Sequence, residues 1–534
     1  LGAEWMYYGA HNKLLVDYSR PFTSKFQNWL KMRYQKIENL NPIWKKNYRS
    51  FAEISVPSPA ERNQVENFSF LNPAEHQNVI DLRLFFSELT SGLIEEFGTV
   101  IKEASDGRTL CGTYYGYITY TALDTWSENG HFALQKLLES DSIDFLVSLI
   151  RYDNRFVGGE SGAMTPVNSF RLHHKAALTQ ADLRTHRSVK ANYMATDNLM
   201  DSAAVLKREL AWALVSGAVF EFGYYGKGWI ASDPRLMELV GKYQFLEQKF
   251  AGDKEVFAST SGQIALIVDD ASVNYVRQDS PLFRLGNREL IRQLAHAGTG
   301  FDTYLLSDLP KIADQYRCFI FSGTYLLSDD QLQYIQQHLQ GGGRTLVWMH
   351  APGICDGRKF LPQRVEEATG IRMHIQNLFM KPAATVTATT RFLKPGISAS
   401  VNRQRHAQIG PRLIPQQGEV LACADDKLPA VVRQVFEEWT SVYSWVANLS
   451  PPVLQEIAAT AGLTIINDST DDSTYAAGKM IAIHSNHGGP RTLYIADSKA
   501  TQLTELFTGK KYPIEHGQCQ LQLPPKSTAL FFFD

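Results

Sequence analysis

The sequence lacks the features by which disulfide-bonded, zinc-binding and membrane-spanning proteins are recognised. Its 534 residues include five cysteines without CxxC spacing, and their odd number favours buried thiols over a disulfide framework: Cys111, Cys318, Cys355, Cys423 and Cys519. Two histidine pairs, at 173–174 and at 484 and 487, have no carboxylate or thiol at ligand spacing, so we predict no metal site and no cofactor. No run of about eighteen apolar residues occurs, and no membrane span is expected.

The sequence also lacks an excess of charge of either sign. Its 53 lysines and arginines nearly balance 55 acidic residues, and no lysine- or arginine-rich run stands out. Nothing therefore indicates binding to nucleic acid or to a charged membrane surface. The expected partner is a small neutral molecule.

Length and hydropathy pattern divide the chain into three regions, because a chain of this length exceeds what one hydrophobic core supports. Residues 1–252 alternate strand-like and helix-like segments. Residues 262–371 have the pattern of a small doubly wound α/β domain, and residues 372–534 are rich in β segments. The polar stretch around 251–262 is typical of a boundary.

The first region has the pattern of a parallel sheet wrapped by helices. Candidate strands span 110–118, 143–152, 175–179 and 218–224, and Leu1 to Glu4 would be the tail of a fifth. Five strand ends cannot close a (β/α)8 barrel, so either the start of the protein is absent from this sequence or the fold is an open one. A half barrel would expose strand edges and apolar surface, which is an aggregation hazard.

The middle and last regions carry clearer local signals. Short buried-type strands are expected at 263–268, 301–305, 318–321 and 345–349, with helices at 288–296 and 329–339. Ser328 and Gln331 form a capping-box pattern at the start of the second helix. Further β segments are expected at 385–389, 419–424, 479–484, 491–495 and 529–533, with a helix-like insertion at 451–462.

The most informative segment is 173–186, where a short apolar strand leads directly into polar residues: Gln180, Asp182, Arg184 and His186. This is how a (β/α)8 barrel strand looks where it meets the active-site face. Four polar groups within seven residues are costly to bury without a purpose. A functional site is therefore predicted at the end of this strand.

The chain resembles bacterial glycoside hydrolases of the family 42 type. The resemblance is carried by Glu4-Trp5, by 143–145 leading to Tyr152-Asp153-Asn154-Arg155, by the 173–186 segment and by 226–234. It implies a TIM barrel, an amidotransferase-like trimerisation domain that makes a homotrimer, and a small β-sandwich domain. The five strand ends would then be strands four to eight of the barrel, with three βα units missing. The compartment stays open between the cytoplasm and the periplasm of a bacterium.

The resemblance implies retaining hydrolysis of a β-galactoside-like substrate by two carboxylates about 5 to 5.5 Å apart. Glu4 matches the acid/base on strand four, where burial against Trp5 would raise its pKa. On strand seven, however, Gln180 stands where the related enzymes carry the nucleophilic glutamate. An amide cannot act as that nucleophile. Three explanations stay open: a degenerate natural homologue, a deliberate Glu→Gln change made to trap ligand, or a nucleophile relocated to Asp182.

Aromatic and polar residues near the predicted strand ends are candidates for binding the sugar. Flat rings stack on the apolar faces of pyranoses, and Trp5 and Trp229 are the preferred platforms. Arg184 would pair either with a carboxylate of the site or with one on the barrel rim. Glu160 is expected to be a solvated loop residue. The predicted substrate-binding set is Trp5, Tyr115, Tyr152, Asn154, Arg184 and Trp229.

The amidotransferase-like pattern of the middle region raises a rival enzyme hypothesis. That chemistry needs a thiolate on a strand-to-helix elbow, but Cys355 lies in a separate loop. A role in subunit contact is the better interpretation. Two functions therefore remain: a β-galactosidase-like retaining glycosidase, with impaired activity if Gln180 leaves it without a nucleophile, and a catalytically inactive homologue that binds carbohydrate.

Overall fold

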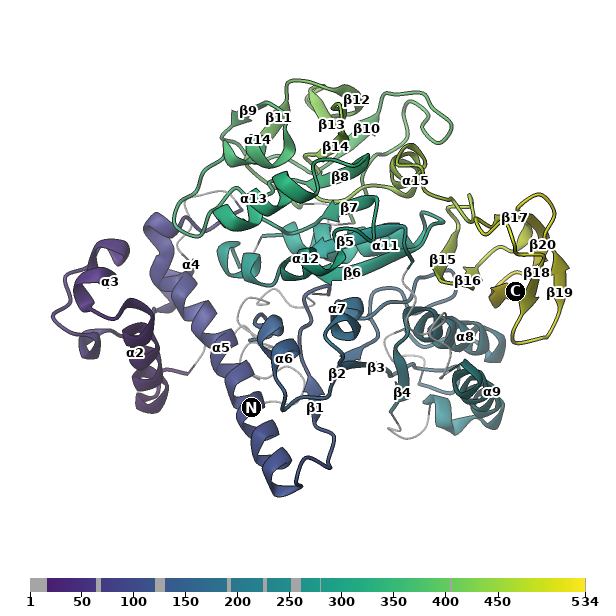
Figure 1. Cartoon of the computed structure of the whole chain (residues 1–534), viewed down its shortest axis with the longest axis horizontal. Coiled ribbons are helices and arrows are strands. Elements are labelled where there is room, and N and C mark those ends of the chain that lie inside the picture. The colour runs from purple at the N-terminus through teal and green to yellow at the C-terminus, as the bar shows by residue number, and fades with distance from the viewer. Residues whose placement is uncertain are drawn as a thin grey trace.

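The computed structural model describes residues 17–63, 69–120, 130–189, 194–223, 228–250, 261–278, 280–403 and 406–533. Figure 1 shows a parallel sheet with its helices in the lower half, a larger sheet above it and a β-rich region at the C-terminal end. A helical arm lies at the other side of the molecule. The expected α/β fold with a parallel sheet is confirmed.

The helical arm consists of α2 (Arg20–Tyr34), α3 (Ile37–Trp44) and the first half of α5 (Pro73–Ala104), together with η1 (Phe51–Glu53) and α4 (Pro59–Asn63). Ser19 caps α2 through its hydroxyl, which accepts from the Phe22 amide. Apolar residues on facing sides of these helices form a separate small core, including Phe26, Leu30, Leu40 and Phe85.

The first sheet contains β1 (Gly112–Tyr114), β2 (Phe145–Leu149), β3 (Ala176–Ala181) and β4 (Val219–Phe222), in that order and all parallel. Each lies within or close to a predicted strand. The connections include α6 (Leu134–Glu139), α7 (Val167–Leu172) and α8 (Leu199–Ser216), and η3 (Ile230–Ser232) and α9 (Pro234–Phe250) follow β4. Successive parallel strands joined through helices place their carboxyl ends at one edge. The expected strand tail at Leu1 to Glu4 lies outside the described residues.

The middle sheet has eight strands in the order β10-β12-β13-β14-β8-β7-β5-β6. Its parallel part is β5 (Ile264–Val268), β6 (Phe301–Leu305), β7 (Cys318–Phe321) and β8 (Arg344–Met349). The surrounding helical segments are η4 (Ala271–Tyr275), η5 (Arg284–Arg288), α11 (Glu289–Ala295), η6 (Leu306–Asp308), α12 (Leu309–Ile312), α13 (Asp329–His338) and α14 (Arg364–Thr369). The capping box of Ser328 and Gln331 is confirmed.

This sheet continues past the boundary expected at residue 372. β14 (Trp439–Ser444) pairs in parallel with β8, and β13 (Pro429–Val435), β12 (Glu419–Ala424) and β10 (Ala384–Val386) follow outward in antiparallel pairs. β9 (Met373–Gln376) and β11 (Arg412–Pro415) form a separate pair. Nearly a hundred residues separate β8 from its partner β14, so local sequence pattern does not reveal the pairing.

The C-terminal region packs two β layers on one apolar core. One sheet orders β15 (Asp472–Ala477), β16 (Met480–Ser485), β21 (Ser527–Phe533), β18 (Gln502–Glu505) and β19 (Lys511–Pro513). The other pairs β17 (Gly489–Tyr494) with β20 (Gln518–Leu523), and α15 (Pro451–Thr460) precedes both. Leu493 and Leu521 share their cluster with Ile483 and Phe531 from the first sheet.

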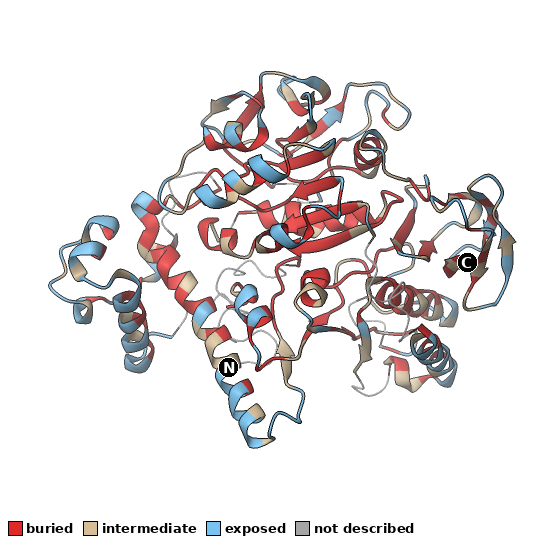
Figure 2. Ribbon diagram, viewed as in Figure 1, coloured by how far each residue is buried: buried red, intermediate tan, exposed pale blue. Residues whose placement is uncertain are grey.

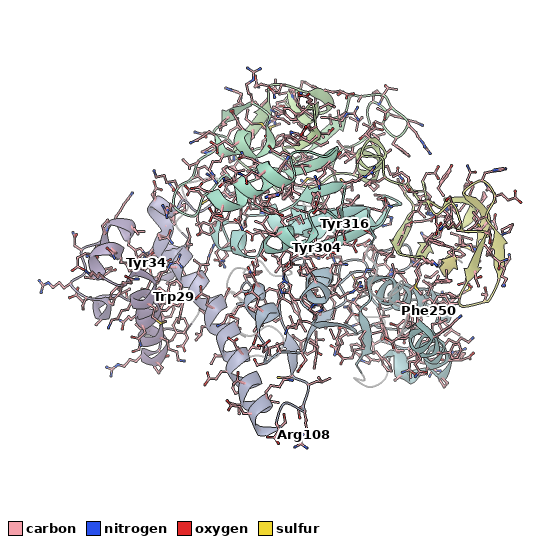
Figure 3. All side chains as sticks on the ribbon, viewed as in Figure 1. Trp29, Tyr34, Arg108, Phe250, Tyr304 and Tyr316 are labelled. Carbon is pink, nitrogen blue, oxygen red and sulfur yellow. The ribbon has the colours of Figure 1, made fainter. Side chains whose placement is uncertain are left out.

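Buried residues concentrate on the middle sheet and on the inner side of α8, whereas α2, α3 and the far end of α5 are largely exposed (Figure 2). Phe250, the last residue of α9, packs on Phe532 with ring centroids 5.3 Å apart, which joins the first region to the C-terminal one (Figure 3). Cys318, Cys355 and Cys519 are buried free thiols. Cys111 and Cys423 are only half-buried, so the expectation was wrong for these two.

Candidate active site

Three polar side chains meet at the carboxyl ends of β1, β3 and β4. Gln180 near the end of β3 donates from Nε2 to the Tyr114 hydroxyl at 2.6 Å and to the Glu221 carboxylate at 3.0 Å. The Cα atoms of Gln180 and Glu221 are register partners in the parallel pair of β3 and β4. Side chains at paired positions of adjacent strands point to the same face of a sheet. An amide, a phenol and a carboxylate therefore form one cluster.

Asp182, just beyond β3, lies in a separate cluster of positive charge. Its carboxylate forms an ion pair with Arg155, accepts from Arg184 at 3.0 Å and accepts from the Tyr152 hydroxyl at 3.0 Å. The side chain is only 9% exposed. Two guanidinium groups and a phenol thus immobilise and neutralise this carboxylate, which makes it a poor nucleophile.

Aromatic rings cover the guanidinium groups that hold Asp182. The Arg155 guanidinium lies 3.9 Å from the Tyr152 ring centroid, and that of Arg184 lies 4.9 Å from the Trp229 ring centroid. Both distances are in the cation–π range. Trp229 is half-exposed at the start of η3. The structure therefore brings three predicted substrate-binding residues, Tyr152, Arg184 and Trp229, next to Asp182.

Other predicted residues do not face this site. Tyr115 is fully buried, and its hydroxyl donates to the Ser87 carbonyl and accepts from the Ala133 amide, so direct contact with a substrate is contradicted. His186 lies near Asp233 instead, with Nε2 3.3 Å from the carboxylate. Asp233 also pairs with Arg187 and Arg235, which hold its pKa well below the ordinary range, mainly through hydrogen bonds from Arg235. The catalytic and sugar-binding predictions for Glu4 and Trp5 fall outside the described residues.

Glu160 is buried, contrary to the expectation of a solvated loop residue. Its carboxylate accepts from Arg292 at 2.6 Å and from the Asn154 amide at 2.7 Å, and His296 lies 3.6 Å away. Burial alone would raise the pKa of Glu160, but these neighbours hold it well below its ordinary value. Asn154 is thus engaged with Glu160 through its amide nitrogen.

A second ion pair ties the same loop to the middle region. Asp153 pairs with Arg288 of η5 and with Arg151, whose guanidinium lies 3.0 Å away. Burial lowers the pKa of Arg151 to about 10. Residues 151–160, between β2 and α7, are therefore anchored from the middle region through two arginines. Sequence analysis missed this because the two segments are more than a hundred residues apart.

The sequence assigned no role to Glu221, and it pointed to Tyr114 and Arg155 only as a strand-end aromatic residue and as part of the 152–155 motif. Glu221 had a usable signal, because it lies in a short apolar strand, Val219 to Phe222, where a charged residue needs a reason. Arg155 had none beyond its place in the 152–155 motif. In the described parts of the chain, no group of three or more histidine, cysteine or acidic residues is placed to hold a metal ion. None of the described helices is long and apolar enough to cross a membrane.

Comparison with known proteins identifies the type of chain. The family model described as β-galactosidase, of glycoside hydrolase family 42, matches residues 7–143. Over this segment the chain resembles the β-galactosidases of glycoside hydrolase family 42. No curated protein sequence matches the chain significantly.

Solved structures with the same fold superpose on nearly all of the chain. A β-galactosidase from Bacillus circulans sp. alkalophilus superposes with a TM-score of 0.58 at 16% identity, covering 97% of this chain and 77% of that one. The β-galactosidase from Rahnella sp. R3 gives 0.62 at 14% identity, with 97% and 77% covered. That from the haloarchaeon Halorubrum lacusprofundi gives 0.63 at 14% identity, with 98% and 78% covered. At sequence identities this low, the superpositions show a shared fold and nothing more specific.

Proposed function

We propose that the protein is a glycoside hydrolase that cleaves a terminal β-glycoside, β-galactoside-like, at the carboxyl ends of β1 to β4. The observation that carries this proposal is the cluster of Gln180, Tyr114 and Glu221, next to Asp182 with its aromatic neighbours. Convergent polar groups flanked by aromatic rings are what a pyranose site requires. The expected region for such a site in this fold is the carboxyl end of the strands.

In the proposed site, Glu4 is the general acid/base and the ring of the sugar lies at the end of β3. Trp229 offers an apolar face for stacking, and Arg184 offers donors for hydroxyl groups. Tyr152 and Asn154 are assigned to the same subsite. The position of Asn154 is fixed by the hydrogen bond from its amide nitrogen to Glu160. The proposal also keeps the retaining, double-displacement course of the reaction. A partial TIM barrel, made of strands four to eight, and a homotrimer belong to the proposal as well.

The amide at position 180 favours one alternative, a homologue that binds carbohydrate without hydrolysing it. Gln180 offers hydrogen bonds but no nucleophile, and Asp182 is neutralised by two arginines. Hydrolysis in this protein therefore depends on a carboxylate from another position. A protein without such a carboxylate would retain only the binding surface.

Turnover of a panel of para-nitrophenyl β-glycosides, the galactoside first, tests the proposed function. Hydrolysis by the wild-type protein supports a glycosidase. Binding of the free sugar by calorimetry, with no turnover of any glycoside in the panel, supports the inactive homologue. If the protein neither hydrolyses any glycoside of the panel nor binds the free sugar, both proposed functions are rejected.

A further inference from the structure

We propose that Glu221 is the nucleophile of this site and replaces the carboxylate that position 180 lacks. This inference rests on the proposed glycosidase function. It assigns the covalent step to β4 instead of β3.

The position of Glu221 is set by the register of β3 and β4. Its Cα is paired with that of Gln180, and its Oε1 lies 3.0 Å from the Gln180 Nε2. A glutamate at position 180 would place a carboxylate oxygen where this amide nitrogen now lies. The Glu221 oxygen is therefore one hydrogen-bond length from the expected place of the nucleophile. A sugar ring can accommodate that offset by a small shift or tilt.

Glu221 differs from the other carboxylates near the site in its freedom to react. Asp182, Asp153 and Glu160 each form ion pairs with buried arginines. Glu221 is half-exposed, and across the described residues no lysine, arginine or histidine lies within ion-pair distance of it. One of its oxygens accepts from Gln180, which leaves the other oxygen for attack. A carboxylate keeps its nucleophilicity when no cation neutralises it.

The amide of Gln180 is compatible with a nucleophilic carboxylate at position 221. Its Nε2 donates to both Tyr114 and Glu221, and these two contacts fix the orientation of the Glu221 carboxylate. A glutamate at position 180 would instead place two negative charges about one hydrogen bond apart, which disfavours ionisation of both. The amide at position 180 instead places a hydrogen-bond donor, and no second negative charge, beside Glu221.

The proposed chemistry is a balanced double displacement. The Glu221 oxygen that does not accept from Gln180 attacks the anomeric carbon, the new ester bond forms as the glycosidic C–O bond breaks, and the leaving oxygen takes a proton from the acid/base of the proposed function. Water then attacks the same carbon, gives a proton back to that acid/base and releases the sugar from Glu221. Both carboxyl groups return to their starting states, and no oxidant or cofactor is consumed.

The test compares the Glu221→Ala, Glu221→Gln and Glu238→Gln variants of the full chain on whichever para-nitrophenyl β-glycoside the wild type hydrolyses. Glu238 on α9 is a matched control, because its exposed side chain pairs with Lys242 of the same helix, away from the candidate site. We expect kcat to fall by about 10³-fold or more in both Glu221 variants and to be unchanged in the control. Added azide should restore turnover by Glu221→Ala and give a glycosyl azide, since a small anion can enter the space of the missing side chain. Thermal unfolding midpoints identify any variant that has not folded.

A purely structural role for Glu221 predicts different results. An active wild type whose Glu221→Gln variant keeps its kcat overturns the inference and leaves the proposed function standing. A fluoroglycoside that forms a slow covalent adduct provides a second measurement on the wild type. Mass mapping of the adduct to Glu221 supports the inference, and mapping to Asp182 or another residue overturns it. A wild type that hydrolyses no glycoside rejects the proposed function itself, and the two failures are thereby distinguished.

Discussion

Arg292 of α11 donates a hydrogen bond to Glu160 at 2.6 Å, across the boundary between the middle sheet and the loop that follows β2. Both side chains are almost fully buried, with 6% and 3% of their surfaces exposed. The loop that ends in Glu160 carries Tyr152 and Arg155, which contact Asp182. The middle domain therefore supports the candidate site from outside the strands that build it.

Replacing Arg292 with leucine should destabilise the protein strongly, because it leaves the Glu160 carboxylate buried without its cation. Breaking a buried ion pair from one side costs about 3–5 kcal/mol. We expect a clear fall in the thermal unfolding midpoint, measured by calorimetry. Lys242→Ala provides the control, since its ion pair with Glu238 is exposed and such pairs contribute about 0–1 kcal/mol. Equal midpoints for wild type and Arg292→Leu would contradict the anchoring role.

The Glu160 carboxyl group should also make stability depend on pH. Its neighbours lower its pKa from the ordinary value of 4.5 in the folded protein, despite burial. The folded state thus binds fewer protons than the unfolded state, so this stability is present above about pH 4.5 and is lost as the pH falls below that value. Glu160→Gln removes this term. We expect the gap in unfolding midpoint between wild type and Glu160→Gln to narrow between pH 6 and pH 3, whereas a constant gap would contradict the lowered pKa.

Local sequence pattern predicted the regular elements of the fold well. The bounds expected for 301–305, 318–321 and 419–424 agree with β6, β7 and β12. Short apolar runs bounded by turn residues determine such strands on their own. Pairing between distant segments is different, because β8 and β14 meet through backbone hydrogen bonds that leave no mark in either segment. The boundary expected at residue 372 therefore missed the second half of the middle sheet.

Only part of the candidate site could be predicted, because the site also combines segments that are distant in the sequence. Gln180, Asp182 and Arg184 lie in one segment, and their density revealed a site. Their partners come from elsewhere: Glu221 from β4, Tyr114 from β1 and Arg155 from the loop after β2. Only the three-dimensional structure shows that Asp182 is neutralised and that Glu221 lies beside Gln180. This contrast changes the interpretation of the amide at position 180.

Asp182→Asn should lower stability and should not behave as the loss of a nucleophile. The substitution leaves Arg155, which is 2% exposed, without its anionic partner, at a cost of about 3–5 kcal/mol. Any loss of turnover should resist rescue by azide, because the defect is the position of Arg155 and Arg184 and not a missing nucleophile. Unfolding midpoints and azide titrations measure the two effects. Azide rescue in the Asp182→Ala variant would support a relocated nucleophile at this position.

Gln180→Glu should destabilise the protein in a pH-dependent manner. The new carboxyl group would lie about one hydrogen bond from Glu221, and two carboxylates sharing a site raise the pKa of one of them. A raised pKa in the folded state means that stability falls as the pH rises from the unfolded value of about 4.3 towards the raised one. We expect the destabilisation relative to wild type to be larger at pH 7.5 than at pH 4.5, by about 2 kcal/mol. Gln180→Met, which adds no charge, should show no such dependence.

Trp229→Ala should weaken substrate binding more than it weakens the fold, because Trp229 is half-exposed and contacts Arg184. Loss of a stacking ring and of the cation–π contact should raise KM by about 10-fold, which corresponds to about 1.4 kcal/mol. Tyr115→Phe is the informative comparison. Its hydroxyl hydrogen-bonds to backbone groups, Ser87 O and Ala133 N, so its removal should cost about 1 kcal/mol of stability and leave KM unchanged. Steady-state kinetics with the nitrophenyl glycoside and unfolding midpoints separate the two variants, and a KM change in Tyr115→Phe alone would reverse the assignment.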